Sequence, residues 1–146
     1  MDSFLARHAA RNSALGLSAT WVLFDDDRKE RKKYPVVAYY TLAGGTVTRE
    51  TIPTNQALPP NPVPVTLLAR LAVSKEYQGR GTGKKTLVTA LRQAVLLRDK
   101  GLPSFGVVLD ILDENALKFY QRFELFLPIS ENPMRLFVPM QAIQYL

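Results

Sequence analysis

The sequence has no cysteine and only one histidine, His8. The lack of cysteine excludes disulfide bonds, thiolate metal sites and a cysteine nucleophile. A single histidine argues against a metal site built from imidazole ligands, so we expect no bound metal. No apolar run approaches the roughly 18 to 20 residues that a membrane-spanning helix requires. We therefore expect a cytoplasmic protein without a membrane partner.

What the sequence has in excess is positive charge. Its 146 residues include 19 lysines and arginines against 13 aspartates and glutamates, which gives a net charge of +6. This balance favours polyanionic partners such as nucleic acid, the phosphates of a coenzyme or an acidic protein. An apolar content of 47% is typical of a globular chain, and we expect one domain spanning residues 1–146.

The amino-terminal half predicts a helix and a hairpin. A helix over 4–15 ends at Gly16 and precedes two strands, 20–24 and 36–43. A charged turn at 25–33 joins the strands, and Gly44-Gly45 is expected to close the second one. Residues 46–64 contain five of the ten prolines and are predicted to form an extended loop.

The second half alternates strand, helix, strand and helix, which predicts a parallel βαβ core. The apolar run 65–73 predicts a strand buried on both faces. A helix stopped by Gly101 leads to a strand over 105–112, and Asp113 is the expected N-cap of the next helix. Two last strands are predicted at 123–127 and 135–140. The expected fold class is α/β (α+β), with one mixed central sheet flanked by helices.

A glycine-rich loop stands between the apolar strand and the following helix, and it reads Gln78-Gly79-Arg80-Gly81-Thr82-Gly83-Lys84. Such a turn presents free N–H groups at the positive end of a helix dipole, where phosphate binds. The spacing does not fit a Walker loop, whose first glycine would fall at Gln78. It also misses the dinucleotide-binding fingerprint, because its third glycine comes one residue early. A tight connection without a ligand is the structural alternative.

The loop resembles motif A of the GNAT acetyltransferase superfamily, in which Gln or Arg is followed by two residues, Gly, one residue and then Gly or Ala. Gln78, Gly81 and Gly83 fill these places. A second segment, Asn115-Ala116-Leu117-Lys118-Phe119-Tyr120, resembles motif B of the same superfamily. The resemblance implies acetyl-CoA as the cosubstrate. It implies contacts with this cosubstrate from the following residues: Leu71, Ala72, Val73, Gln78, Gly79, Arg80, Gly81, Thr82, Gly83, Lys84 and Asn115.

The resemblance also gives each segment a role. It implies that backbone groups of 71–73 pair with the amide arm of the cosubstrate and support the oxyanion, and that Asn115 lies near the pantetheine. It places the hydroxyl of Tyr120 opposite the thioester sulfur. A phenol with a pKa of about 10 is protonated at neutral pH and can give its proton to the departing thiolate. A packed aromatic ring without a catalytic role is the alternative for Tyr120.

More of the chain resembles one branch, the GNAT toxins of bacterial toxin–antitoxin pairs. This likeness includes Gly16-Leu17-Ser18, Tyr39-Tyr40-Thr41-Leu42-Ala43 and 135–140. It implies acetylation of the α-amino group of aminoacyl-tRNA, a ribbon-helix-helix antitoxin as a partner, and a homodimer. An α-amino group has a pKa of about 7.7 to 8.0, so a strong dedicated base is not required. The residues expected to bind tRNA are Arg7, Arg11, Arg70 and Lys75.

The sequence departs from this branch in two places. Toxins of this type carry a further strand and helix before the position of Asp2, so we expect an amino-terminally shortened copy. They also have glycine after the position of Phe123, where this chain has Glu124. Two further functional hypotheses stay open: a GNAT enzyme that acetylates a protein or small-molecule amine, and a non-catalytic remnant that binds coenzyme A.

Overall fold

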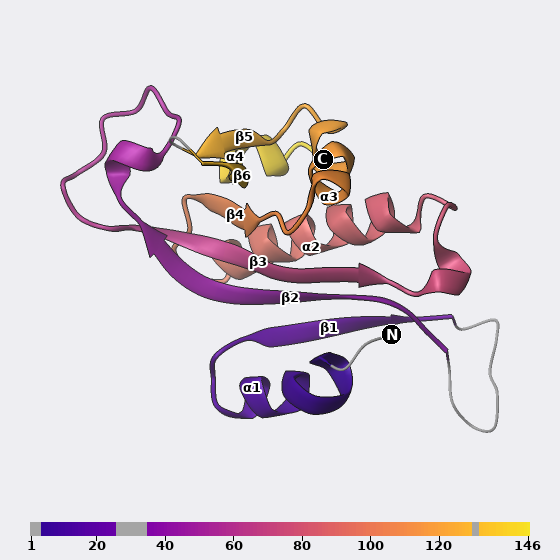
Figure 1. Cartoon of the computed structure of the whole chain (residues 1–146). Coiled ribbons are helices and arrows are strands. Elements are labelled where there is room, and N and C mark those ends of the chain that lie inside the picture. Colours follow the sequence, from indigo (N-terminus) through magenta and orange to yellow (C-terminus); the bar gives the residue numbers. More distant parts are fainter. Residues whose placement is uncertain (1–3, 26–34, 130–131) are drawn as a thin grey trace. The chain divides into compact units, whose positions relative to one another are not determined.

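The strands form a single mixed sheet in the order β1-β2-β3-β4-β6-β5. The computed structural model describes residues 4–25, 35–129 and 132–146 (Figure 1). The strands are β1 Ala19–Phe24, β2 Val36–Val47, β3 Val63–Val73, β4 Gly106–Asp110, β5 Leu127–Ile129 and β6 Asn132–Pro139. The sheet is mixed because β3 and β4 are parallel, whereas β1 with β2 and β4 with β6 are antiparallel. This confirms the expected fold class.

Helical segments connect the strands. The short ones are a π-helical segment η1 Leu5–Ala9, the 3-10 segments η2 Arg49–Thr51 and η3 Lys75–Tyr77, and two helices, α1 Ala10–Ala14 and α4 Met140–Ile143. The longer helices are α2 Thr82–Asp99, which links β3 to β4, and α3 Glu114–Gln121. None of the helices in the described ranges is long and apolar enough to span a membrane.

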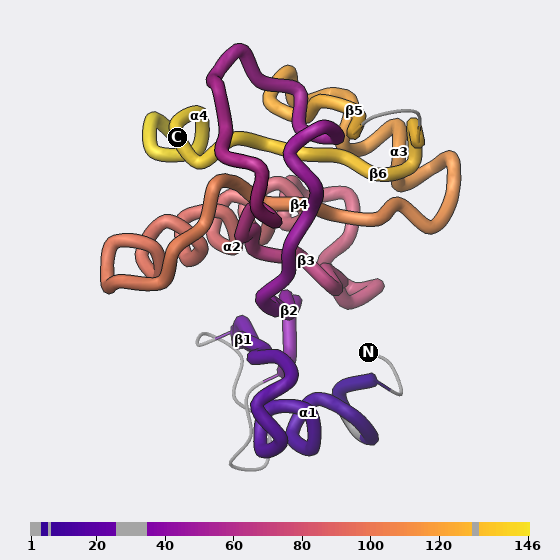
Figure 2. The backbone as a smooth tube through the Cα atoms, turned by 90° about the vertical axis from the view of Figure 1, so that its left-hand side faces the viewer, coloured from indigo at the N-terminus to yellow at the C-terminus, as the bar shows by residue number. Residues whose placement is uncertain are grey.

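The chain divides into two compact units, which we describe separately. Unit 1 comprises Met1–Ala43 and Ala69–Ala90, and unit 2 comprises Gly44–Leu68 and Leu91–Leu146. In unit 1, α1 lies beside β1 (Figure 1 and Figure 2), and Phe4, just before η1, is buried with its ring stacked 6.0 Å from that of Tyr39. Gly16 has a φ of 75° and ends the first helix, as predicted.

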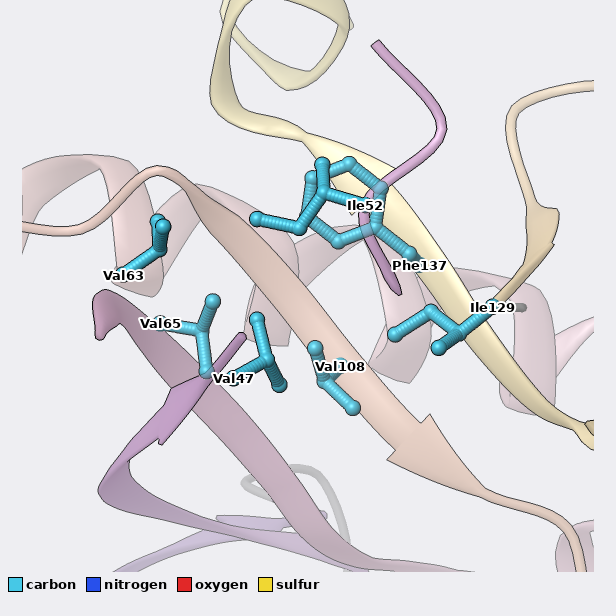
Figure 3. Packing of buried hydrophobic residues seen from close by; sticks show 7 residues of the cluster. All are labelled: Val47, Ile52, Val63, Val65, Val108, Ile129 and Phe137. Atoms are coloured by element: carbon cyan, nitrogen blue, oxygen red, sulfur yellow. The ribbon is translucent and has the colours of Figure 1, made fainter. Parts of the chain in front are cut away.

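Unit 2 is built around an apolar cluster drawn from five strands and a loop. β4 pairs with β3 through Thr66↔Val107 and Leu67↔Val108, and with β6 along its whole length. Figure 3 shows Ile52 and Phe137 as members of this cluster, and Phe137 is fully buried. The buried members of the cluster are Val47, Ile52, Val63, Val65, Val108, Ile129 and Phe137. This core holds the segment after β2 in place.

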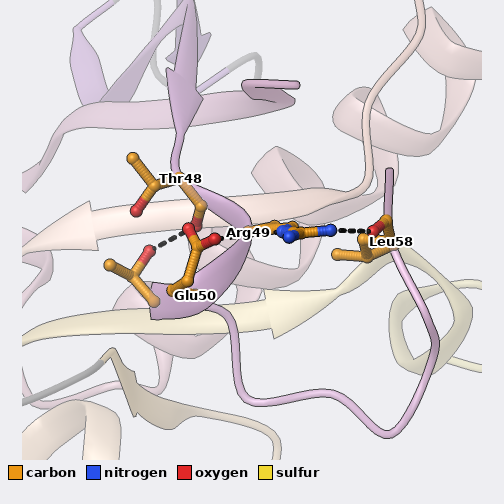
Figure 4. Close-up of polar contacts among 5 residues, drawn as sticks. Thr48, Arg49, Glu50 and Leu58 are labelled. Carbon is orange, nitrogen blue, oxygen red and sulfur yellow. Dashed lines mark hydrogen bonds and ion pairs between the residues drawn. The ribbon is translucent and has the colours of Figure 1, made fainter. Parts of the chain in front are cut away.

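The segment after β2 is more ordered than the extended loop expected for 46–64. β2 runs to Val47, and η2 follows at once. The Arg49 guanidinium donates a hydrogen bond of 2.9 Å to the carbonyl of Leu58 and pairs with Glu50 at 3.0 Å (Figure 4). Thr51 donates 2.8 Å to the carbonyl of Thr48. Because Leu58 also packs against the apolar cluster, the proline-rich stretch is tied to the core at its centre.

Gly44 and Gly45 do not end the second strand, which is a correction to the prediction. β2 continues through them, and a Cβ added at Gly45 would lie 3.0 Å from the side chain of Leu67. A side chain at position 45 would crowd Leu67, so this glycine makes room for packing and does not turn the chain. β3 also differs from its expectation: Ala69 and Arg70 are exposed, so its carboxyl-terminal half is not buried on both faces.

The strand predicted at 123–127 is wrong for most of its length. β5 starts only at Leu127, and the residues before it form a turn whose aromatic rings pack together. Phe123 and Phe126 lie 6.5 Å apart, and Phe126 contacts the ring of Tyr120 at 5.5 Å. Their apolar pattern therefore serves packing around α3 instead of a strand. No pattern in the sequence signals α4, whose Met140 and Ile143 are buried.

Candidate functional site

The glycine loop of unit 1 forms the turn that joins β3 to α2. β3 ends at Val73, η3 follows, and α2 begins at Thr82. Gly79 and Gly81 have φ values of 77° and 76°, a backbone region that glycine adopts without strain. Two left-handed residues in three positions turn the chain back sharply, so that the loop leads directly into an 18-residue helix. The expected strand–glycine loop–helix arrangement is confirmed.

Three hydrogen bonds hold the base of this loop. The backbone N–H of Ser74 donates 2.8 Å to the carbonyl of Val37, which ties the end of β3 to β2. The side-chain amide of Gln78 donates 3.0 Å to the carbonyl of Val73. The N–H of Tyr77 donates 2.9 Å to the carbonyl of Ser74 and closes η3. Gln78, expected to contact a cosubstrate, thus uses part of its side chain to fold the loop.

The mouth of the loop has the properties of an anion site. The first N–H groups of α2 have no helical carbonyl to bond, and they lie at the positive end of the helix dipole. A Cβ added at Gly79 or Gly81 would meet nothing within 4 Å, so the backbone there is open to an approaching group. Arg80, Lys84 and Lys85 are exposed around it. The charge and the open backbone of this turn are compatible with a bound pyrophosphate, and the contacts of the individual residues stay a prediction.

The other residues expected in unit 1 line the same turn. Leu71, Ala72 and Val73 are half-buried at the end of β3. Thr82 and Gly83 are half-buried at the start of α2, where the carbonyl of Thr82 accepts a hydrogen bond of 2.8 Å from Thr86. The fold therefore brings the predicted residues from 71 to 84 into one continuous strand-to-helix segment.

α3 in unit 2 carries the second predicted constellation. The Asp113 carboxylate accepts a hydrogen bond of 2.8 Å from the N–H of Ala116, which confirms it as the N-cap. Asn115 is exposed in the first turn, whereas Tyr120 is 9% exposed in the last turn. The two residues are five positions apart and do not share a face of the helix.

The ring of Tyr120 packs against two other aromatic rings. Its ring contacts Phe119 at 5.0 Å and Phe126 at 5.5 Å, both edge-on. Burial raises the pKa of Tyr120 to about 12, so the phenol stays protonated at neutral pH. Among the described residues, none forms a hydrogen bond with its hydroxyl, and this oxygen is not one of the fully buried polar atoms. The hydroxyl therefore keeps some contact with solvent while the ring is enclosed.

The basic residues predicted to bind tRNA all belong to unit 1. Arg7, Arg11 and Lys75 are exposed on η1, α1 and η3. Arg70 is also exposed, and its guanidinium lies over the ring of Phe4 at 4.1 Å, which is a cation–π contact. The contact with Phe4 orients the Arg70 guanidinium, while the residue as a whole stays exposed.

Sequence reasoning missed two contacts of the loop. The hydroxyl of Tyr77 donates a hydrogen bond of 2.6 Å to the carboxylate of Asp25 at the end of β1. The guanidinium of Arg80 lies 5.5 Å from the centre of the Tyr77 ring. No local pattern signals a bond between residues this far apart in the chain. Within the described ranges, no cluster of acidic or histidine side chains is suited to a metal ion.

Known proteins resemble this chain in both sequence and fold. Residues 18–124 match the family model described as Acetyltransferase (GNAT) domain. A tRNA-acetylating toxin of Mycobacterium tuberculosis (strain ATCC 25618 / H37Rv) is 35% identical over 126 residues, which are 85% of this chain and 70% of the relative. The crystal structure of a KacT mutant has a TM-score of 0.85 at 26% identity, covering 98% of this chain and 83% of that one.

AtaT is a further relative of known structure. AtaT complexed with acetyl-methionyl-tRNAfMet has a TM-score of 0.83 at 25% identity, covering 97% of this chain and 82% of that one. A mutant AtaT toxin bound to the C-terminus of the antitoxin AtaR and acetyl-CoA has a TM-score of 0.76 at 25% identity, covering 97% and 80%.

The mixed sheet, the strand–glycine loop–helix turn and these matches define an N-acetyltransferase that uses acetyl-CoA. The matched family region contains both the glycine loop and α3. The chain belongs to the GNAT acetyltransferase family.

Proposed function

We propose that this enzyme transfers the acetyl group of acetyl-CoA to the α-amino group of aminoacyl-tRNA and thereby acts as a translation-blocking toxin. The observation that carries the proposal is the 35% identity, over 85% of the chain, to a tRNA-acetylating toxin. The whole chain 1–146 acts as one acetyltransferase domain. An antitoxin of the ribbon-helix-helix class neutralises it, and the active form is a homodimer.

The glycine loop holds the pyrophosphate of acetyl-CoA. Backbone N–H groups from Gly79 to Lys84 and the guanidinium of Arg80 neutralise its charge. Backbone groups of Leu71–Val73 pair with the amide arm and stabilise the oxyanion, and Asn115 contacts the pantetheine. The exposed cations, the open glycines and the free first turn of α2 support this assignment.

Tyr120 acts as the general acid. The amine nitrogen forms a bond to the acetyl carbon, the bond between this carbon and sulfur breaks, and Tyr120 gives its phenolic proton to the departing thiolate. The proton that leaves the amine then restores the phenol through solvent. A pKa of about 12 supports this role because the proton is always present at neutral pH. The remaining contact of the hydroxyl with solvent supports it as well.

The proposed amine needs little activation. An α-amino group with a pKa of about 7.7 to 8.0 is roughly one-tenth neutral at pH 7, whereas a lysine side chain with a pKa of about 10.4 is almost wholly charged. The phosphates of the tRNA would contact Arg7, Arg11, Arg70 and Lys75, all of them exposed in unit 1.

The test is acetyl transfer from radiolabelled acetyl-CoA to bulk tRNA. Purified protein is mixed with charged tRNA or with the same pool after deacylation, and acid-precipitable label is counted. We expect label on charged tRNA only, and its release by mild base, which cleaves the ester bond to the tRNA. Transfer in a cell extract that survives ribonuclease would instead indicate a protein or small-molecule amine. Acetyl-CoA binding without transfer to any acceptor would indicate the non-catalytic remnant.

A further inference from the structure

A three-residue chain of contacts connects the end of β1 to the mouth of the glycine loop, entirely within unit 1. The carboxylate of Asp25 accepts a hydrogen bond of 2.6 Å from the hydroxyl of Tyr77, and the ring of Tyr77 lies beneath the guanidinium of Arg80. The first contact is short, as expected when a hydroxyl donates to an ionised carboxylate. The second lies within the roughly 6 Å over which a cation is attracted to an aromatic face.

Asp25 fixes Tyr77, and Tyr77 in turn restricts the Arg80 side chain, which is otherwise free to move. Arg80 is exposed and stands between two glycines with positive φ, so neither the backbone nor burial restricts its rotamers. The Tyr77 ring is half-buried, and its hydroxyl is anchored to an element 52 positions away in the sequence. A fixed ring offers the guanidinium one preferred position above the loop.

We propose that Asp25 and Tyr77 are positioning residues that hold the Arg80 guanidinium ready for the phosphates of acetyl-CoA. The inference rests on the proposed role of the glycine loop as the pyrophosphate site. Arg80 loses side-chain conformational entropy when it binds phosphate. Because the contact with Tyr77 already restricts the side chain in the free protein, less entropy is lost on binding and the cosubstrate binds more tightly. Neither residue touches the reacting atoms, and both act only through Arg80.

The test is calorimetric titration of coenzyme A into the full chain. Tyr77→Phe keeps the ring and removes the bond to Asp25, and we expect about 3- to 10-fold weaker binding, with a similar loss for Asp25→Ala. Arg80→Ala should weaken binding by about 10- to 30-fold. The kcat for acetyl transfer stays unchanged in Tyr77→Phe, and only the KM for acetyl-CoA rises. Tyr145→Phe is the matched control, because Tyr145 is 84% exposed.

The double variant Tyr77→Phe/Arg80→Ala separates positioning from a general effect on the fold. If Tyr77 acts through Arg80, the double variant binds coenzyme A as Arg80→Ala does. A loss from Tyr77→Phe that is equally large in both backgrounds, or no loss in either, overturns the inference. Unchanged binding in Arg80→Ala overturns the phosphate site itself, and the inference with it. Thermal unfolding without ligand verifies that each variant is folded.

Discussion

At the scale of single residues, Tyr120 combines an enclosed ring with a proposed catalytic role. Its ring is buried against Phe119 and Phe126, yet its hydroxyl has no bonding partner among the described residues. A tyrosine kept only for packing would lose little when its hydroxyl is removed. We expect Tyr120→Phe to lower kcat by about 10²- to 10⁴-fold, the usual contribution of a general acid, and to leave the KM for acetyl-CoA nearly unchanged.

Steady-state kinetics with charged tRNA measures this effect. Tyr145→Phe provides the matched control, since it removes an exposed hydroxyl of the same kind. A kcat for Tyr120→Phe within a factor of two or so of the wild-type value would assign Tyr120 to packing alone.

The raised pKa of Tyr120 also makes stability depend on pH. Below pH 10 the phenol is neutral in both the folded and the unfolded chain. Above this pH the unfolded chain releases the proton first, so unfolding becomes more favourable until the pH passes the folded pKa of about 12. The resulting decrease in stability is on the order of 2 kcal/mol.

Urea unfolding of the wild type and of Tyr120→Phe between pH 8 and pH 12 tests this prediction. The wild type should lose stability more steeply than the variant above pH 10, because only the wild type has a buried phenol at this position. The burial-raised pKa of Tyr40 is common to both proteins and cancels in the comparison. Parallel curves would mean that the Tyr120 phenol ionises as easily in the folded chain as in the unfolded one.

At the scale of elements, the strand-to-helix turn depends on its left-handed glycines. Alanine at Gly81 would meet no neighbouring atom but would be strained at a φ of 76°, at a cost of about 1 to 2 kcal/mol. The loop would relax, and its N–H groups would no longer converge. We expect Gly81→Ala to weaken coenzyme A binding by at least about tenfold, as judged by calorimetry.

Two other glycines provide controls for this change. Gly44 has ordinary backbone angles and open space, so Gly44→Ala should alter neither binding nor stability. Gly101 has a φ of 111° just after α2, so Gly101→Ala should lower the melting temperature without weakening coenzyme A binding. If Gly101→Ala weakens binding as much as Gly81→Ala, the loss reflects stability and not the geometry of the loop.

The sequence predicted those features of the fold and of the candidate site that depend on residues close together in the chain. Asp113 caps α3 by accepting a hydrogen bond from an N–H three residues away. The glycine loop needs residues that adopt a positive φ, and its own glycines supply them. Both features could therefore be predicted from the local sequence. The end of the second strand was wrongly predicted at Gly45, because this glycine makes room for the Leu67 side chain of another strand. Likewise, the phenylalanines at 123 and 126 match a strand pattern but pack around Tyr120. The bond from Tyr77 to Asp25 joins distant residues without any sequence signature.

Over the whole molecule, the positive charge is distributed unevenly. Unit 1 holds 12 of the 19 lysines and arginines but 6 of the 13 aspartates and glutamates, so its formal charge equals the +6 of the entire chain. Unit 2 is formally neutral as a result. A polyanion such as tRNA is therefore attracted mainly to unit 1, which carries the glycine loop and the four residues proposed to contact tRNA.

The salt dependence of tRNA binding tests this distribution. Removing one phosphate-binding cation reduces the steepness of log K against log salt by about 0.7 to 0.9, so Arg7→Gln/Arg11→Gln should reduce it by about 1.4 to 1.8. Lys100→Gln/Lys118→Gln changes the net charge equally but lies in unit 2, and its slope should match the wild type. Uncharged tRNA suffices for this titration, because the phosphates bind independently of the amino acid. Equal reductions in both double variants would mean that tRNA senses net charge alone and has no preferred surface on unit 1.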